Sequence, residues 1–267
     1  MEKLQVAPLI LVVMISFIAH AQKLPNVQQA SLYAPDNIKI DGKATEWDNK
    51  FQAYNHATEL FYAIANDDNN LYLIIQAINE NIINKIYRNG ITFTINQSKK
   101  DNKERLSFTY PVFDKGERFS VNIKLKPVIV PGSVASIMKA DSFMNANNKL
   151  MNNKSKYIMV TGAKGIDSLI SIYNENGIKA AALFDNHMVY TLEMAIALKY
   201  LNLAEDSPVK LSYNLLLHPL KGGLDNVIRT IGPDGIPTVT RNTSEIPELL
   251  ALASSTDFWG EYTLAKK

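Results

Sequence analysis

Short apolar runs rich in β-branched and aromatic residues recur along this chain, and clusters of Asn, Asp, Gly and Pro separate them. The clearest pair covers residues 60–65 and 71–78, which the sequence Asn-Asp-Asp-Asn-Asn joins. Two such runs with a short polar connection predict a β-hairpin. Because most connections are short turns, the series predicts an all-β fold, an antiparallel β-sandwich of the jelly-roll or immunoglobulin-like kind.

Residues 131–156 depart from this pattern, because they carry several methionines among many Asn and Lys residues without a sustained period of two. We interpret them as a long insertion in the sandwich, partly helical between residues 134 and 150, whose methionines pack on it rather than bind a metal. A loop is expected at 219–245 and a short helix at 246–254. Further strands are expected at 91–95, 106–113, 119–125, 157–161, 168–173, 178–184, 188–196, 209–217 and 258–264.

The N-terminus indicates the compartment, and the absence of cysteine excludes several kinds of site. An apolar run at 6–19 and the small-x-small triplet Ala-His-Ala at 19–21 predict a signal peptide, residues 1–21, cleaved after Ala21; a retained anchor is the alternative. With 0 Cys, disulfides, thiolate metal sites and a cysteine nucleophile are excluded. We expect an exported protein, periplasmic or extracellular, with no membrane span after signal removal.

The mature chain is long enough to bury a core of its own without disulfides. We expect residues 22–37 to be a lead-in and residues 38–267 to form a single β-sandwich domain, with the insertion near 131–156. The net charge of +2 gives no reason to expect a nucleic acid or an anionic membrane as a partner.

Residues 38–47, Ile-Lys-Ile-Asp-Gly-Lys-Ala-Thr-Glu-Trp, predict a strand, a tight Asp-Gly turn and a tryptophan that enters the core. We interpret Trp47 as plugging one end of that core, with ligand stacking as the alternative. The other tryptophan, Trp259, is also expected to serve the structure.

This stretch and four later ones resemble the family 9 carbohydrate-binding modules and related DOMON-like exported β-sandwich domains. The later stretches are Asp-Asp-Asn-Asn-Leu-Tyr-Leu at 67–73, Tyr-Thr-Leu-Glu-Met-Ala-Ile at 190–196, Leu-Ser-Tyr-Asn at 211–214 and Asp-Phe-Trp-Gly at 257–260. The resemblance implies a sandwich that holds a sugar between two aromatic rings, helped by charged and amide side chains.

The resemblance also implies where those rings lie. The first ring comes just before the strand expected at 91–95, so the candidate is Tyr87, with Arg88 and Asn89 beside it. The tryptophan typical of that place is absent, and the place of the second ring holds Leu-Ala-Ser at 252–254. Tyr173 is a further candidate for an exposed stacking ring.

Two inorganic or prosthetic groups are considered. Asp67 and Asp68 are candidate calcium ligands because that ion takes carboxylate oxygens, and a plain Asx-rich turn is the alternative. Haem binding, known in related sandwich domains, would need an axial His187 or His218 with a methionine. We expect no cofactor beyond a structural calcium ion.

The sequence holds no catalytic motif. Glu193 is either one carboxylate of a glycosidase pair or a glutamate that bonds a turn backbone. We therefore expect no enzymatic activity. The function that we rank first is that of an exported carbohydrate-binding-module-like protein, which binds a saccharide by aromatic stacking in a loop cleft or on a sheet face. The alternative is a structural or protein-interaction sandwich without a sugar site, and haem binding ranks third.

Overall fold

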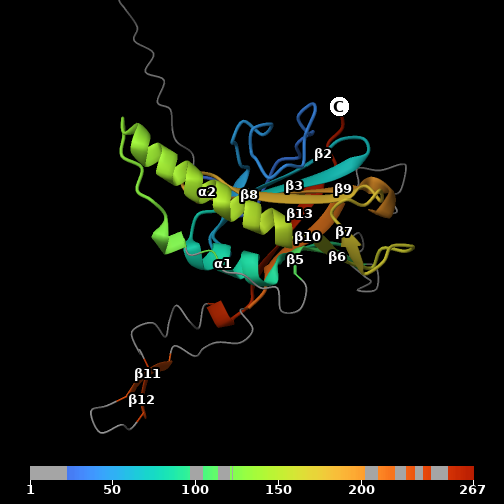
Figure 1. Ribbon diagram of the computed structural model, residues 1–267. Helices are drawn as coiled ribbons and strands as arrows, with labels where there is room; N and C mark the ends of the chain where they lie inside the picture. Colours follow the sequence, from blue (N-terminus) through green and yellow to red (C-terminus); the bar gives the residue numbers. More distant parts are fainter. Residues whose placement is uncertain are drawn as a thin grey trace, which may run out of the picture.

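Two antiparallel sheets face each other in the computed structural model, which describes residues 23–96, 105–113, 121, 123–201, 210–219, 227–231, 237–241 and 252–267 (Figure 1). The signal peptide expected at 1–21 and most of the helix expected at 246–254 lie outside these residues. All strand pairs within the two sheets are antiparallel. The predicted fold class is confirmed.

The smaller sheet has five strands in the order β1-β2-β3-β9-β8: Ala53–Asn55, Leu60–Asn66, Asn70–Ala77, Tyr190–Ala197 and Ile178–Phe184. The larger sheet has six in the order β13-β10-β4-β5-β6-β7: Thr256–Thr263, Lys210–Leu217, Ile91–Asn96, Arg105–Val112, Tyr157–Thr161 and Leu169–Ser171. Strands β11 (Val227–Ile231) and β12 (Pro237–Arg241) pair with each other, within the region expected to be a loop.

The main core lies between the sheets, because alternate side chains of each strand point inward. Tyr62 and Leu73 come from the smaller sheet, and Phe93 and Phe108 from the larger one; all are fully buried. The predicted hairpin at 60–78 is formed by β2 and β3, which pair along their whole length. The apolar runs identified in the sequence therefore supply the side chains of the main core.

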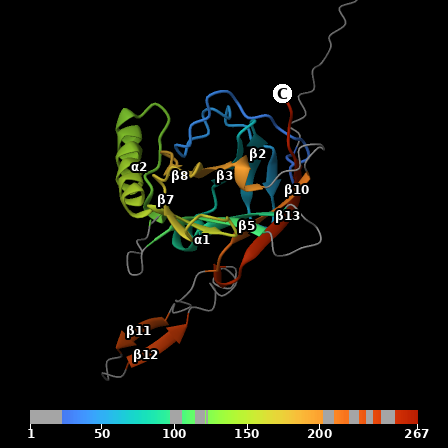
Figure 2. The same ribbon diagram turned by 90° about the vertical axis from the view of Figure 1, so that its right-hand side faces the viewer.

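The outer face of the smaller sheet carries a second, smaller core. Residues 32–51 cross this face (Figure 2). Trp47 packs there with Ala63, Ile74 and Ala195. Two expectations are wrong in detail: residues 38–40 form no strand, and Trp47 covers the outside of a sheet rather than one end of the main core. The physical reason is that β2, β3 and β9 are apolar on both faces, so the outer face also needs a cover.

Helix α1 (Glu80–Asn89) was not expected, although its pattern is visible in the sequence. Ile82, Ile83 and Ile86 are buried at helical spacing, and the Asn79 side chain caps the helix by accepting a hydrogen bond from the Asn81 amide at 2.8 Å. Its contacts with β3, β5 and β10 place it against both sheets.

Helix α2 (Val134–Lys154) confirms the helical insertion and extends it by one turn. It lies beside the edge strand β8, where the Asn148 side chain donates to the carbonyl of Phe184 and accepts from its amide, both at 2.8 Å. Residues Ile123–Leu125 form the short 3-10 helix η2 instead of a strand, and Leu198–Leu201 form η3. None of the described helices combines the length and apolarity needed to cross a membrane.

Candidate functional site

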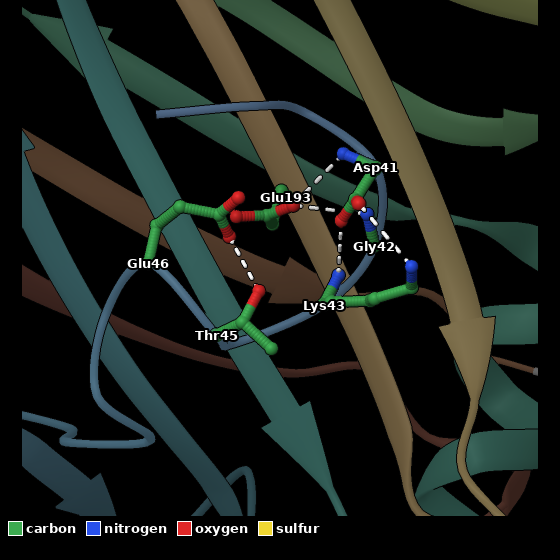
Figure 3. Close-up of polar contacts among 6 residues, drawn as sticks. All are labelled: Asp41, Gly42, Lys43, Thr45, Glu46 and Glu193. Atoms are coloured by element: carbon green, nitrogen blue, oxygen red, sulfur yellow. Dashed lines mark hydrogen bonds and ion pairs between the residues drawn. The ribbon is translucent and has the colours of Figure 1, made fainter. Parts of the chain in front are cut away.

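Glu193 on β9 holds the loop at residues 41–47 against the smaller sheet. Its Oε2 atom accepts hydrogen bonds from the backbone N–H groups of Asp41 at 3.0 Å and Gly42 at 2.9 Å (Figure 3). Its Oε1 atom accepts one from the indole Nε1 of Trp47 at 2.9 Å. Of the two interpretations of this residue, the glutamate that bonds a turn backbone is confirmed.

Gly42 allows this loop to lie directly on the sheet. Its φ is +83°, and an added Cβ would stand 2.7 Å from the carbonyl carbon of Ala182 and from the nitrogen of Leu183. Only glycine tolerates both the backbone conformation and the close approach. The Asp-Gly pair is therefore a docking point on β8 as well as a turn.

Burial raises the pKa of the Glu193 carboxyl above its ordinary value of 4.5, and the hydrogen bonds from Trp47, Gly42 and Asp41 offset part of that rise. Between the ordinary and the raised pKa, the folded protein keeps a proton that the unfolded chain has lost. Stability from this group therefore falls as the pH rises through that window. We expect the free energy of unfolding of wild type, relative to Glu193→Gln, to decrease as the pH rises from 4.5. Urea unfolding of both proteins at several pH values measures this, and parallel pH profiles would contradict it.

A groove runs between α2, the end of β8 and the loop at 42–49. Its cavity has a volume of about 690 Å³, and amide and charged side chains line much of it, including Asn49, Asn145 and Asn152. The only aromatic side chain in its lining is Phe184, which is 2 % exposed. This loop cleft can hydrogen-bond a polar ligand, but it offers no ring on which a sugar could stack.

The outer side of the larger sheet forms a second candidate surface, which we call the polar face. The strand pairing places Trp259, Asn214, Thr94 and Ser107 in one row across β13, β10, β4 and β5. The neighbouring rows are Glu261, Ser212, Asn96 and Arg105 on one side, and Asp257, Leu216, Thr92 and Thr109 on the other. Because cross-strand partners point to the same side of a sheet, these side chains share one face.

Hydrogen bonds fix the positions of these side chains. Thr94 and Ser107 share one at 2.9 Å, and Thr92 and Thr109 share one at 2.6 Å. The Asn214 amide donates to the Asp257 carboxylate at 2.7 Å. The polar face is therefore a preorganised surface on rigid strands rather than a flexible loop.

Trp259 is the large aromatic side chain of the polar face. It is 46 % exposed, and the guanidinium carbon of Arg105 lies 5.4 Å from its ring centroid. The expectation that this tryptophan is structural is wrong, because its neighbours Phe258, Gly260 and Tyr262 take the inward positions of β13. The signal was present in the alternation of the sequence Asp-Phe-Trp-Gly-Glu-Tyr, which puts Trp259 on the side of the two acids.

The residues predicted around Tyr87 lie in the last turn of α1. Tyr87 is 1 % exposed and packs with Phe113 at a centroid distance of 5.9 Å, so its ring offers no face to solvent. Arg88 is exposed, and the Asn89 amide donates to the carbonyl of Pro219 at 2.8 Å. A role in ligand binding stays a prediction for Arg88 and Asn89. The predicted stacking of Tyr87 on a ligand is not supported, because its ring is buried.

Tyr173 lies after β7, at the opposite edge of the larger sheet from Trp259. Its side chain is 73 % exposed, and the Lys156 ammonium donates to its hydroxyl at 2.9 Å. Strands β13 and β7 are separated by five strand intervals, roughly 24 Å. Tyr173 and Trp259 therefore cannot clamp one sugar ring between them.

The Asx-rich turn binds its own backbone. The Asp67 carboxylate accepts from the backbone N–H groups of Asn69 and Asn70 at 2.7 and 2.6 Å and from the Tyr72 hydroxyl at 2.7 Å. Burial acts to raise the pKa of Asp67, but these donors lower it below its ordinary value. Asp68 is exposed beside it. Within the described ranges, His, Asp and Glu form no group of three or more that could hold a metal.

The two histidines considered for haem lie in different surroundings. His187 is exposed in the turn between β8 and β9, and the Nε2 atom of His218 shares a hydrogen bond with Thr92 Oγ1 at 2.6 Å on the larger sheet. Haem binding and calcium binding stay predictions.

The two facing antiparallel sheets define this chain as a β-sandwich protein. The sequence matches no family model and no curated protein. Among solved structures, the chain is similar to a carbohydrate binding module family 9 from Caldicellulosiruptor kristjanssonii in complex with glucose, with 10 % identity, coverage of 89 % of this chain and 95 % of that chain, and a TM-score of 0.34. That structure belongs to the family that the sequence motifs resemble.

Proposed function

We propose that this protein is an exported, non-catalytic saccharide-binding module that holds its ligand on the polar face. The observation that carries the proposal is Trp259, an exposed ring set among amide, hydroxyl and charged side chains on rigid strands. The signal-peptide pattern at residues 1–21 supports export.

Each part of the polar face matches one part of a sugar. The C–H face of a pyranose is apolar and packs on an aromatic ring, so Trp259 provides the platform. The hydroxyls around the sugar need donors and acceptors at its rim. Arg105 supplies donors next to the ring, while Asp257 supplies acceptors on the same strand as Trp259.

Binding of glucose, the ligand named for the similar solved structure, and of an oligosaccharide array tests the proposal. We expect Trp259→Ala to weaken saccharide binding roughly five- to thirtyfold, because it removes a stacking contact of about 1–2 kcal/mol. Tyr173→Ala is the matched control, since it removes the other aromatic ring that is exposed among the described residues, and it should bind like wild type. No release of reducing ends from the bound oligosaccharide is expected.

Intrinsic fluorescence gives a local readout. The chain has 2 Trp, of which Trp47 is 4 % exposed and Trp259 is 46 % exposed. A bound saccharide should therefore shield Trp259 from iodide quenching. Failure to retain any glycan would favour the structural or protein-interaction alternative, and loss of binding in Tyr173→Ala instead would move the site to β7. A Soret band in the purified protein would favour haem binding.

A further inference from the structure

Exposed apolar side chains gather at one end of α2 and in the segment before it. Six large ones lie between residues 125 and 138, and we call this region the apolar tip. They are Leu125 at 68 %, Val128 at 80 %, Val130 at 52 %, Val134 at 70 %, Ile137 at 38 % and Met138 at 65 % exposed. Soluble proteins usually scatter such residues singly, so a cluster marks an interaction surface.

The apolar tip is an ordered unit. The Ser136 hydroxyl donates to the Val130 carbonyl at 3.3 Å and accepts from its amide at 2.9 Å, which folds the segment onto the first turn of α2. Val134, Ile137 and Met138 follow at helical spacing, so they share one face of the helix. Figure 1 shows this end of α2 projecting at the upper left, beyond the two sheets.

The charged residues within the segment 121–140 have one sign. Lys124, Lys126 and Lys139 are exposed there, and the segment contains no Asp or Glu. The Lys126 ammonium donates to the carbonyl of His187 at 3.0 Å. The next acid, Asp141, accepts a hydrogen bond from the Asn186 amide at 3.0 Å. The net charge of the whole chain is only +2, so it does not reflect this local excess of positive charge.

We propose that the apolar tip inserts into the surface of a membrane that carries anionic lipids. The aliphatic side chains would enter the boundary between headgroups and acyl chains, and the lysines would contact the anionic headgroups. A projecting tip fits a fluid lipid surface, which needs no complementary shape, whereas a stable protein partner needs a matched area of roughly 800 Å² on each side. Helix α2 packs on β8 of the smaller sheet, whereas the polar face belongs to the larger sheet, so membrane contact at the tip leaves the polar face open.

A single label tests the inference on the full chain. The protein has 0 Cys, so Val128→Cys provides a unique site for an environment-sensitive fluorophore. We expect its emission to shift to the blue with vesicles of phosphatidylglycerol and phosphatidylethanolamine, and not with vesicles of phosphatidylcholine. The matched control is Leu169→Cys, an apolar residue 45 % exposed on β7, whose label should not respond.

The effect of removing the positive charges on vesicle binding is the second measurement. Replacing Lys124, Lys126 and Lys139 together by Gln should raise the lipid concentration for half-maximal response at least tenfold, because each lysine contributes about fivefold near an anionic surface. Saccharide binding by the same variant should be unchanged. An unresponsive label at residue 128, an equal response to phosphatidylcholine, or a lipid-free shift that grows with protein concentration would overturn the inference, the last in favour of self-association.

Discussion

Glu193→Ala is expected to lower the free energy of unfolding by about 4 kcal/mol. The substitution removes three hydrogen bonds at once and leaves the N–H groups of Asp41, Gly42 and Trp47 without their acceptor. Glu193 is 0 % exposed, so water cannot replace the lost carboxylate without opening the second core. Urea unfolding at neutral pH measures the change.

The matched control for this prediction is Glu175→Ala, because Glu175 is an exposed glutamate in a turn. We expect that variant to stay within about 0.5 kcal/mol of wild type. Glu193→Gln should fall between the two, since its amide keeps one acceptor oxygen. A Glu193→Ala variant that unfolds within 1 kcal/mol of wild type would show that the loop at 41–47 does not depend on the carboxylate.

Gly260→Ala is expected to cost about 3 kcal/mol, because the added methyl group would run into the ring of Tyr213. Gly260 pairs with Tyr213 across β13 and β10, and the new Cβ would stand 2.8 Å from Cε1 and closer still to Cζ and Oη. The ring has little room to move, since its hydroxyl shares a hydrogen bond with the Tyr62 hydroxyl at 2.9 Å. The Tyr62 hydroxyl in turn accepts from the backbone N–H of Gln28 at 2.9 Å.

A double-mutant cycle separates this clash from any general effect on β13. In a Tyr213→Leu background the ring atoms are gone, so the same Gly260→Ala change should cost less than 1 kcal/mol. Thermal or urea unfolding of the four proteins gives the coupling energy. An equal cost in both backgrounds would mean that Tyr213 is not the obstacle.

The regular part of the fold was predictable because it depends on local alternation. Strand β8 begins and ends at the residues that the apolar pattern indicated, Ile178–Phe184, and the hairpin of β2 and β3 was predicted as well. Helix α1 was missed because its buried isoleucines follow a helical period among polar residues, between two stretches interpreted as strands. The 3-10 helix η2 replaces an expected strand, since short apolar runs do not distinguish the two states.

The candidate site was harder to predict than the fold. Tyr87 has the right composition for a stacking ring, but its place on the inner face of α1 buries it. Trp259 was assigned to the structure, and only the register of β13 against β10 shows that it stands in a polar row. Sequence spacing alone did not tell that the Tyr87 side chain would be buried and that the Trp259 side chain would face solvent.

The sequence by itself determined the all-β class, the helical insertion and the Asp-Gly turn, because alternation and turn chemistry act over a few neighbouring residues. The tertiary structure decided that Glu193, 146 positions beyond Trp47, would hold the 41–47 loop on the outside of a sheet. It also decided that Trp259 and Arg105 would meet on one face and that an apolar tip would remain uncovered. These outcomes depend on which distant strands pair and in which register, and that choice is made by the packing of the whole core.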